Sequence, residues 1–117
     1  MISRLLAFLM VVLVAASPAV AAEVLQVRTA SLLQVGDGNR TYTVQLACID
    51  VEPDAESAAL GWLREQLPRR RRVNLRPVGR REGQLLARVT PLGDEQDLST
   101  GLVAAGLAGD SCHAESV

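Results

Sequence analysis

The chain has 117 residues, of which 49% are hydrophobic and 21% charged, and its formal net charge at pH 7 is -1. This length is that of one domain and excludes a second. The near-neutral charge excludes a strong overall field that would draw the protein to nucleic acid or to an anionic membrane.

The first 22 residues have the composition of a signal peptide: Arg4 precedes an apolar run from Leu5 to Ala16, and small residues follow up to Ala22. The run is too short to span a bilayer, which takes about 20 apolar residues. We expect cleavage after Ala21 or Ala22, with an uncleaved membrane anchor as the alternative. The prediction is a signal peptide over residues 1–22, a folded domain over 23–112 and a tail over 113–117. The destination would be the periplasm, an organelle lumen or the cell exterior, without stable membrane insertion after cleavage.

Two cysteines, Cys48 and Cys112, would remain after this cleavage. Exported proteins meet an oxidising compartment, where an even cysteine count indicates a bridge. We expect a disulfide between Cys48 and Cys112, the alternative being two separate buried thiols.

The first half of the mature chain reads as strands. Apolar and polar residues alternate at the start of 23–33, which predicts a half-buried strand, and a second strand or a bend follows. A tight reversal over 36–39, rich in residues that tolerate positive φ, then leads into a strand over 40–49.

A helix follows these strands. Apolar residues recur at helical spacing from Ala55 to Leu67, Asp54 is placed to cap the free N–H groups, and Pro68 ends the helix.

The remaining elements are a hairpin and a short helix. Residues 71–78 and 84–92 alternate as two paired strands around a turn at 79–83. A last helix begins near Leu98 and ends at Gly106, a C′ glycine.

The order of strand, strand, strand, helix, strand, strand, helix predicts a mainly β protein with helices (α+β). It is the plan of a five-stranded Greek-key barrel of the oligonucleotide/oligosaccharide-binding (OB) kind, with one helix between strands three and four and another at the C-terminus.

Two segments of the sequence carry a family resemblance, QLACIDVEPDAESAALGWLREQL and VNLRPVGRREGQLLARVTPLGDEQDLSTGLVAAGLA. They resemble the staphylococcal nuclease-like (thermonuclease) family, whose lines read approximately V-x-D-G-D-T, then V-R-L-x-G-I-D-A-P-E, Y-G-R-x-L-A-x-V and L-V-x-x-G-L-A. The matching frame comprises Val44, Leu46, Ile49, Asp50, Gly83, Leu86, Ala87, Val89 and residues 102–108. The resemblance implies the barrel described above.

The family's catalytic residues are mostly absent at the aligned positions. Two aspartates hold calcium in the family; Ser31 replaces one and Asp50 retains the other. The glutamate that acts on the attacking water aligns with Pro53, and the two phosphate-binding arginines align with Gln45 and Gln84. Losing even one charge-stabilising donor typically costs about 2.7–4 kcal/mol of transition-state stabilisation. The resemblance therefore implies a nuclease-like frame without working nuclease chemistry.

Three functional hypotheses remain open. The first is an inactive exported module, a monomer without a cofactor, that binds a partner or has a structural role. The second is a weak calcium-dependent nuclease acting on DNA or RNA, which would use Asp50 as metal ligand together with Glu52 or Asp54. An aspartate at a strand end also serves as a turn cap. The third is a binder of nucleic acid, another polyanion or an acidic protein through arginines at positions 69, 70, 71, 72 and 76 (Arg69, Arg70, Arg71, Arg72, Arg76), unless these only form a solvated face.

Overall fold

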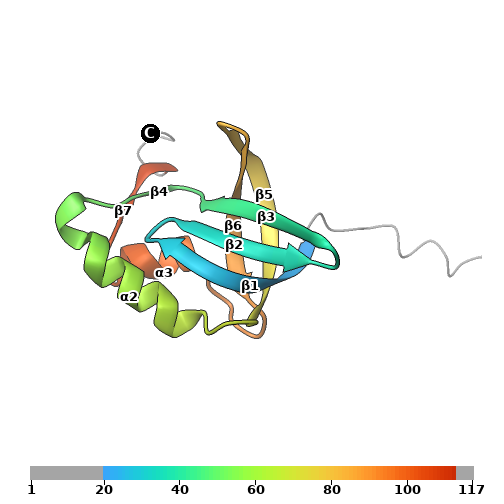
Figure 1. Cartoon of the computed structure of the whole chain (residues 1–117). Coiled ribbons are helices and arrows are strands. Elements are labelled where there is room, and N and C mark those ends of the chain that lie inside the picture. Colours follow the sequence, from blue (N-terminus) through green and yellow to red (C-terminus); the bar gives the residue numbers. More distant parts are fainter. Residues whose placement is uncertain (1–19, 113–117) are drawn as a thin grey trace, which may run out of the picture.

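The computed structural model of the protein describes residues 20–112, so most of the expected signal peptide and the tail over 113–117 lie outside the described residues. Figure 1 shows a barrel of strands with helices on one side. Within the described part of the chain, no helix is both long and apolar enough to cross a membrane.

Five strands close into a barrel in the order β1-β2-β3-β6-β5. They are β1 (Val20–Thr29), β2 (Leu32–Asp37), β3 (Arg40–Leu46), β5 (Arg72–Arg81) and β6 (Gln84–Pro91). Neighbouring strands are antiparallel except for β3 and β6, which run parallel, and β5 returns to pair with β1. The predicted mainly β class is confirmed, and the architecture is consistent with an OB-like α+β fold.

Alternation of side chains along the strands fills the barrel. Inward positions are aliphatic and fully buried, and Leu63 and Leu102 from the helices complete the same cluster. The barrel residues that are at most 1% exposed are Val24, Leu33, Val35, Val44, Val73, Leu75, Ala87 and Val89. Residues next to these along each strand therefore point outward.

The helix after β3 begins later than predicted. Pro53 opens a short 3-10 helix, η1 (Pro53–Ala55), and α2 (Glu56–Gln66) follows. The residue before α2 is Ala55, with no side-chain cap, so the predicted capping role of Asp54 is wrong. The reason is that Pro53 fixes a tight first turn that already contains Asp54. Instead, the carboxylate of Glu56 accepts a hydrogen bond of 2.9 Å from the N–H of Ala30, which ties α2 to the turn after β1.

The last helix, α3 (Leu98–Ala104), ends as predicted. Gly106 has φ of 76°, its N–H donates to the carbonyl of Val103, and the N–H of Leu107 donates to that of Leu102. These two bonds form a Schellman motif, which satisfies carbonyls that the helix end leaves free.

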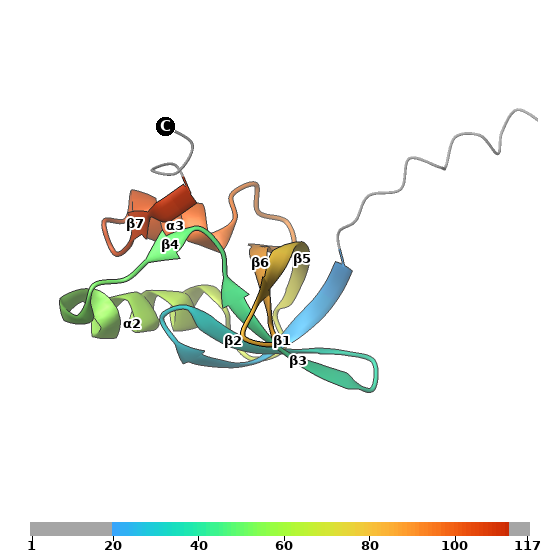
Figure 2. The same cartoon turned by 90° about the horizontal axis from the view of Figure 1, so that it is seen from above.

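Two elements were not predicted. The short strands β4 (Ile49–Asp50) and β7 (Gly109–Asp110) pair as a separate two-stranded sheet. Figures 1 and 2 both place this sheet and α3 at the end of the molecule opposite the β2–β3 hairpin. The pairing joins the segment after β3 to the C-terminal segment, so the residues around Cys48 and Cys112 come together.

Candidate functional site

The two glutamines that align with phosphate-binding arginines lie on neighbouring strands. Gln45 in β3 pairs with Leu86 in β6, and Gln84 stands two residues earlier on β6, so both glutamines belong to the same outward face. Both are half-buried, and neither side chain makes a hydrogen bond within residues 20–112. This face presents amides where the family has positive charge.

Ser31 lies beside this face, in the turn between β1 and β2. Its N–H donates to the Thr29 hydroxyl (3.1 Å), and its carbonyl accepts from the N–H of Leu46 (2.8 Å). The structure thus places Gln45 and Gln84 on the adjacent strands β3 and β6, and Ser31 directly before β2, the other neighbour of β3. Only Ser31, Gln45 and Gln84 among the aligned positions lie in or beside the barrel.

Asp50 and Pro53 lie beyond the turn that follows β3. Asp50 is exposed in β4, opposite Gly109, and its side chain makes no hydrogen bond or ion pair in the described part of the chain. Pro53 is exposed at the start of η1. Within residues 20–112, no three His, Cys, Asp or Glu side chains gather as a group that could hold a metal ion. The oxygen donors around Asp50 therefore do not fit a calcium site of the family's kind.

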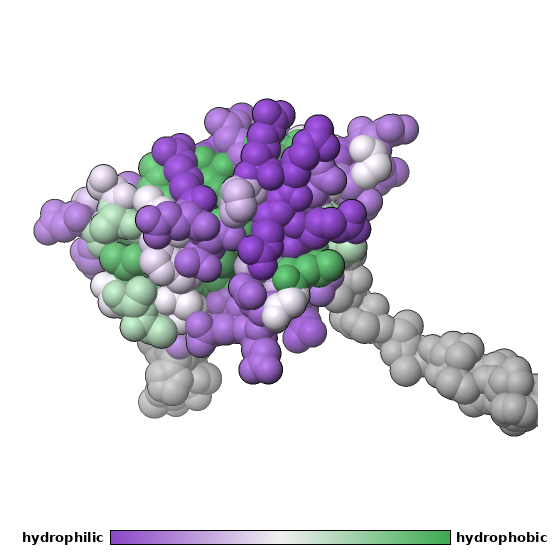
Figure 3. All heavy atoms as spheres, turned by 90° about the horizontal axis from the view of Figure 1, so that it is seen from below, coloured by the Kyte–Doolittle hydropathy of each residue, from purple (hydrophilic) through white to green (hydrophobic). Residues whose placement is uncertain are grey.

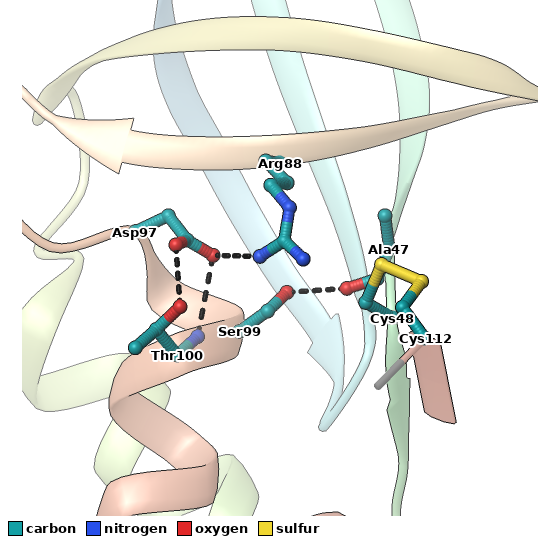
Figure 4. Close-up of a disulfide and its surroundings, with 7 residues drawn as sticks. All are labelled: Ala47, Cys48, Arg88, Asp97, Ser99, Thr100 and Cys112. Atoms are coloured by element: carbon teal, nitrogen blue, oxygen red, sulfur yellow. Dashed lines mark hydrogen bonds and ion pairs between the residues drawn. A yellow bond between two sulfur atoms is a disulfide. The ribbon is translucent and has the colours of Figure 1, made fainter. Parts of the chain in front are cut away.

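The predicted disulfide is present. Cys48 and Cys112 are joined across 64 positions of sequence, with Cα atoms 4.7 Å apart. Cys48 has φ of 68°, a left-handed conformation that favours glycine. Next to it, the buried hydroxyl of Ser99 donates to the carbonyl of Ala47 (2.6 Å), so α3 and the disulfide hold the same turn (Figure 4).

A charged cluster joins β6 to α3 near the disulfide (Figure 4). The carboxylate of Asp97 accepts hydrogen bonds from the hydroxyl (2.6 Å) and N–H (3.2 Å) of Thr100 and forms an ion pair with Arg88 (3.1 Å). Burial alone would raise the pKa of Asp97, but the Thr100 hydrogen bonds and the Arg88 charge outweigh it and lower this pKa below its usual value. The sequence analysis missed this cluster, although an aspartate directly before Leu98 is a typical N-cap signal.

Two of the clustered arginines are used within the fold. Arg70 pairs with Glu23 (3.4 Å), and Arg71 pairs with Asp94 (3.6 Å) and donates to the carbonyl of Leu92 (3.2 Å). Both ion pairs are largely exposed and contribute little stability. They nevertheless leave Arg70 and Arg71 partly neutralised.

The arginines of β5 are different. Arg72, Arg76, Arg80 and Arg81, which we term the arginine strand, are all exposed, and none of their side chains forms a hydrogen bond or ion pair with any residue from 20 to 112. The side chain of Arg69, which precedes β5, is also exposed and makes no hydrogen bond or ion pair within the described residues. Figure 3 shows the molecule from below, the side opposite the β5–β6 hairpin at the top of Figure 1, and there too strongly hydrophilic residues gather over the middle of the face. Of the predicted polyanion-binding residues, Arg69, Arg72 and Arg76 are therefore free to meet a ligand.

A shallow hollow adjoins the arginine strand. Arg76 pairs with Arg88 across β5 and β6, and the next outward pair is Asn74 with Thr90. With Glu95 and Asp97 these residues line a space of about 270 Å³. Like charges directly opposite one another repel, and Asp97 relieves this repulsion by neutralising Arg88. Arg76 keeps its charge for solvent or for a ligand.

No family model matches the chain, and no curated protein is similar enough in sequence to count as a relative.

Proposed function

We propose that the protein is an exported, non-catalytic barrel of the staphylococcal nuclease-like kind that binds an anionic polymer through the arginine strand. The observation that carries the proposal is the set of four exposed arginines on β5 without an ion-pair partner in the described chain. Arginines crowded on one strand repel one another, and a bound anion relieves this repulsion. A row left unpaired on one strand favours an external anion.

Two features support the nuclease-like frame. The closed five-stranded barrel, with β3 parallel to β6, supports the expected Greek-key arrangement. Cys48 occupies the position of the glycine in the family's R-L-x-G-I-D line, and its φ of 68° is a conformation that favours glycine. The frame is thus kept while the charged positions of the family are Ser31, Gln45, Pro53 and Gln84.

A polymer suits the arginine strand better than a small anion does. Arg72 and Arg76 lie on the outward face of β5, and the register shift between Pro77 and Gly79 places Arg81, opposite Gln84, on that face as well. Arg80, opposite Leu85, lies on the other face. Because residues two apart along a strand stand about 7 Å apart, the outward arginines are spread along the strand rather than gathered in one compact pocket. Each guanidinium can bind a phosphate or sulfate group bidentately. Single exposed contacts are weak, but several along one polymer release counterions together and add up to useful affinity.

Salt dependence of binding tests this proposal. The probe is a fluorescent single-stranded DNA oligonucleotide, titrated with the oxidised protein at 50 and 200 mM salt. If the three outward arginines meet phosphates, the affinity falls roughly 20-fold between these concentrations. Absence of binding at the lower salt concentration, or an affinity that does not change with salt, would remove the proposal.

A matched pair of variants locates the surface. R76Q/R81Q removes two charges from the outward face of the arginine strand, whereas R28Q/R40Q removes two exposed charges from β1 and β3. We expect R76Q/R81Q to weaken binding and to reduce the slope of log affinity against log salt by about 1.4. We expect the control variant R28Q/R40Q to have an affinity for the oligonucleotide close to that of the unchanged protein. Calcium-dependent cleavage of the probe that disappears in Asp50→Asn would instead favour a nuclease.

A further inference from the structure

The seam between β1 and β5 closes the barrel, and it depends on the first residues that the structure describes. The register pairs along this seam are Val20 with Leu75, Ala21 with Asn74, Ala22 with Val73, and Glu23 with Arg72. Beyond them, Val24 exchanges two backbone hydrogen bonds with Arg71 (2.9 Å) and Arg70 (2.7 Å). The strand β1 thus begins at Val20, earlier than the sequence pattern predicts.

Cleavage after Ala22 would remove most of this seam. Only the pair of Glu23 with Arg72 and the two bonds of Val24 would remain. Ala22, at 5% exposure, is part of the hydrophobic core, so its loss would also open the core beside Val73. The backbone of β5 opposite the lost residues would become a free edge, with unpaired N–H and C=O groups next to the buried Val73 and Leu75. Cleavage after Ala21 would remove two of the four pairs and leave Ala22 as a charged N-terminus at a core position.

We infer that the precursor is cut between Ala19 and Val20, so that the mature chain begins with the first residue of β1. The sequence permits this cut, because Ser17 and Ala19 are small residues at the third and first positions before the bond. All four register pairs of the seam then survive processing. This inference rests on export, which is part of the proposed function.

The N-terminus of the exported protein decides the matter. The full chain is expressed in a bacterium with a general secretion pathway, carrying a C-terminal tag, and the exported form is examined by intact mass and N-terminal sequencing. We expect a start at Val20. A start at Ala22 or Glu23 would overturn this inference and leave export in place. A precursor that is never cleaved or exported would overturn both.

Two signal variants sharpen the assignment. A19Q places a large polar residue directly before the proposed bond and should make the precursor accumulate. The matched control is A21Q, which alters the residue before the bond between Ala21 and Ala22, one of the two at which the sequence predicts cleavage. Ala21 is exposed in β1, so the substitution leaves the fold intact, and this precursor should be processed like the unchanged chain. The opposite pattern would show that the cut lies after Ala21.

Stability provides a readout independent of the peptidase. Chains that begin at Val20 or at Glu23 and run to the natural C-terminus are compared after oxidation by thermal unfolding. We expect the shorter chain to melt at least about 5 °C lower, since a loss of even 1 kcal/mol shifts a domain of this size by that much. Equal melting temperatures would show that the seam does not need residues 20–22 and would contradict the inference.

Discussion

A single carboxylate, that of Asp97, connects the barrel to its last helix. It caps α3 through Thr100 and neutralises Arg88 on β6, and its side chain is only 16% exposed. An N-cap residue contributes about 0.5–2 kcal/mol, and a partly buried ion pair adds to this. Asp97 therefore stabilises both the helix and the position of Arg88 next to Arg76.

Removal of the Asp97 side chain tests this role. We expect Asp97→Ala to lower the free energy of unfolding at pH 7 by about 1–2 kcal/mol. Asp97→Asn keeps a capping oxygen but loses the charge, so its loss should be smaller. The control is Asp94→Ala, whose exposed pair with Arg71 is worth less than about 0.5 kcal/mol. Urea unfolding measures all three, and equal effects of D97A and D94A would contradict this account.

The pH dependence of the same variants has a definite sign. The pKa of Asp97 is lower in the folded protein than in the unfolded chain, where it is about 3.9. The stabilisation from its charge is therefore complete above the unfolded pKa and disappears as the pH falls through the lower folded value. The difference in unfolding free energy between the unchanged protein and Asp97→Asn should be constant from pH 7 to 5 and shrink below about pH 4. A difference that grows on acidification would rule out this assignment.

At the scale of elements, α2 and α3 approach one another at a glycine. A Cβ atom on Gly101 of α3 would lie 2.8 Å from the Cη2 atom of Trp62 on α2. Gly61 of α2 faces open space, with no heavy atom within 4 Å of the corresponding position. Both glycines lie in helices, but only Gly101 has a close neighbour. Substituting each by alanine therefore separates the effect of side-chain packing on stability from the effect of helix propensity.

We expect Gly101→Ala to reduce the free energy of unfolding by about 1–2 kcal/mol, because overpacking outweighs the gain in helix propensity. Gly61→Ala should instead stabilise the protein by up to about 1 kcal/mol. The fluorescence of Trp62, the chain's single tryptophan, should shift in the first variant and not in the second. Stabilisation by both substitutions would show that the helices can separate without loss.

The elements that sequence reasoning found are those with a local period. The alternation of apolar residues predicted the strands that became β1, β5 and β6, the turn over 36–39 predicted the strand that became β3, and the glycine after the last helix predicted its end. For β2 the pattern left a strand and a bend as alternatives. The cysteine pairing followed from there being only two. The strands β4 and β7 could not be predicted, because two residues each carry no period and their pairing joins distant parts of the chain.

The candidate site was predicted less well. The arginine cluster was visible in the sequence, but its division into paired Arg70 and Arg71 and unpaired β5 arginines depends on where Glu23 and Asp94 lie in space. The pair of Arg88 with Asp97 spans a strand, a loop and a helix end, and no sequence spacing specifies it. Asp54 failed as a cap because the proline before it starts a different kind of turn.

For the molecule as a whole, the bond between Cys48 and Cys112 joins the middle of the chain to its C-terminal segment. It encloses β5, β6 and both α-helices in one covalent loop. The chain-entropy model assigns such a closure about 4 kcal/mol, which is a large part of the net stability of a small domain. Cys48 itself has a left-handed conformation, which costs about 1–2 kcal/mol for residues other than glycine.

These opposing contributions can be separated with two bridge-free variants. We expect Cys48→Ser with Cys112→Ser to lower the free energy of unfolding by about 4 kcal/mol. Cys48→Gly with Cys112→Ser loses the same bridge but accepts the left-handed backbone, so it should be about 1 kcal/mol more stable than the serine pair. Urea unfolding under oxidising conditions compares them, and reduction of the unchanged protein should reproduce the stability of a bridge-free chain. If the glycine variant is no more stable than the serine variant, the turn relaxes once the bridge is gone, and the left-handed conformation of Cys48 is imposed by the disulfide rather than by the barrel.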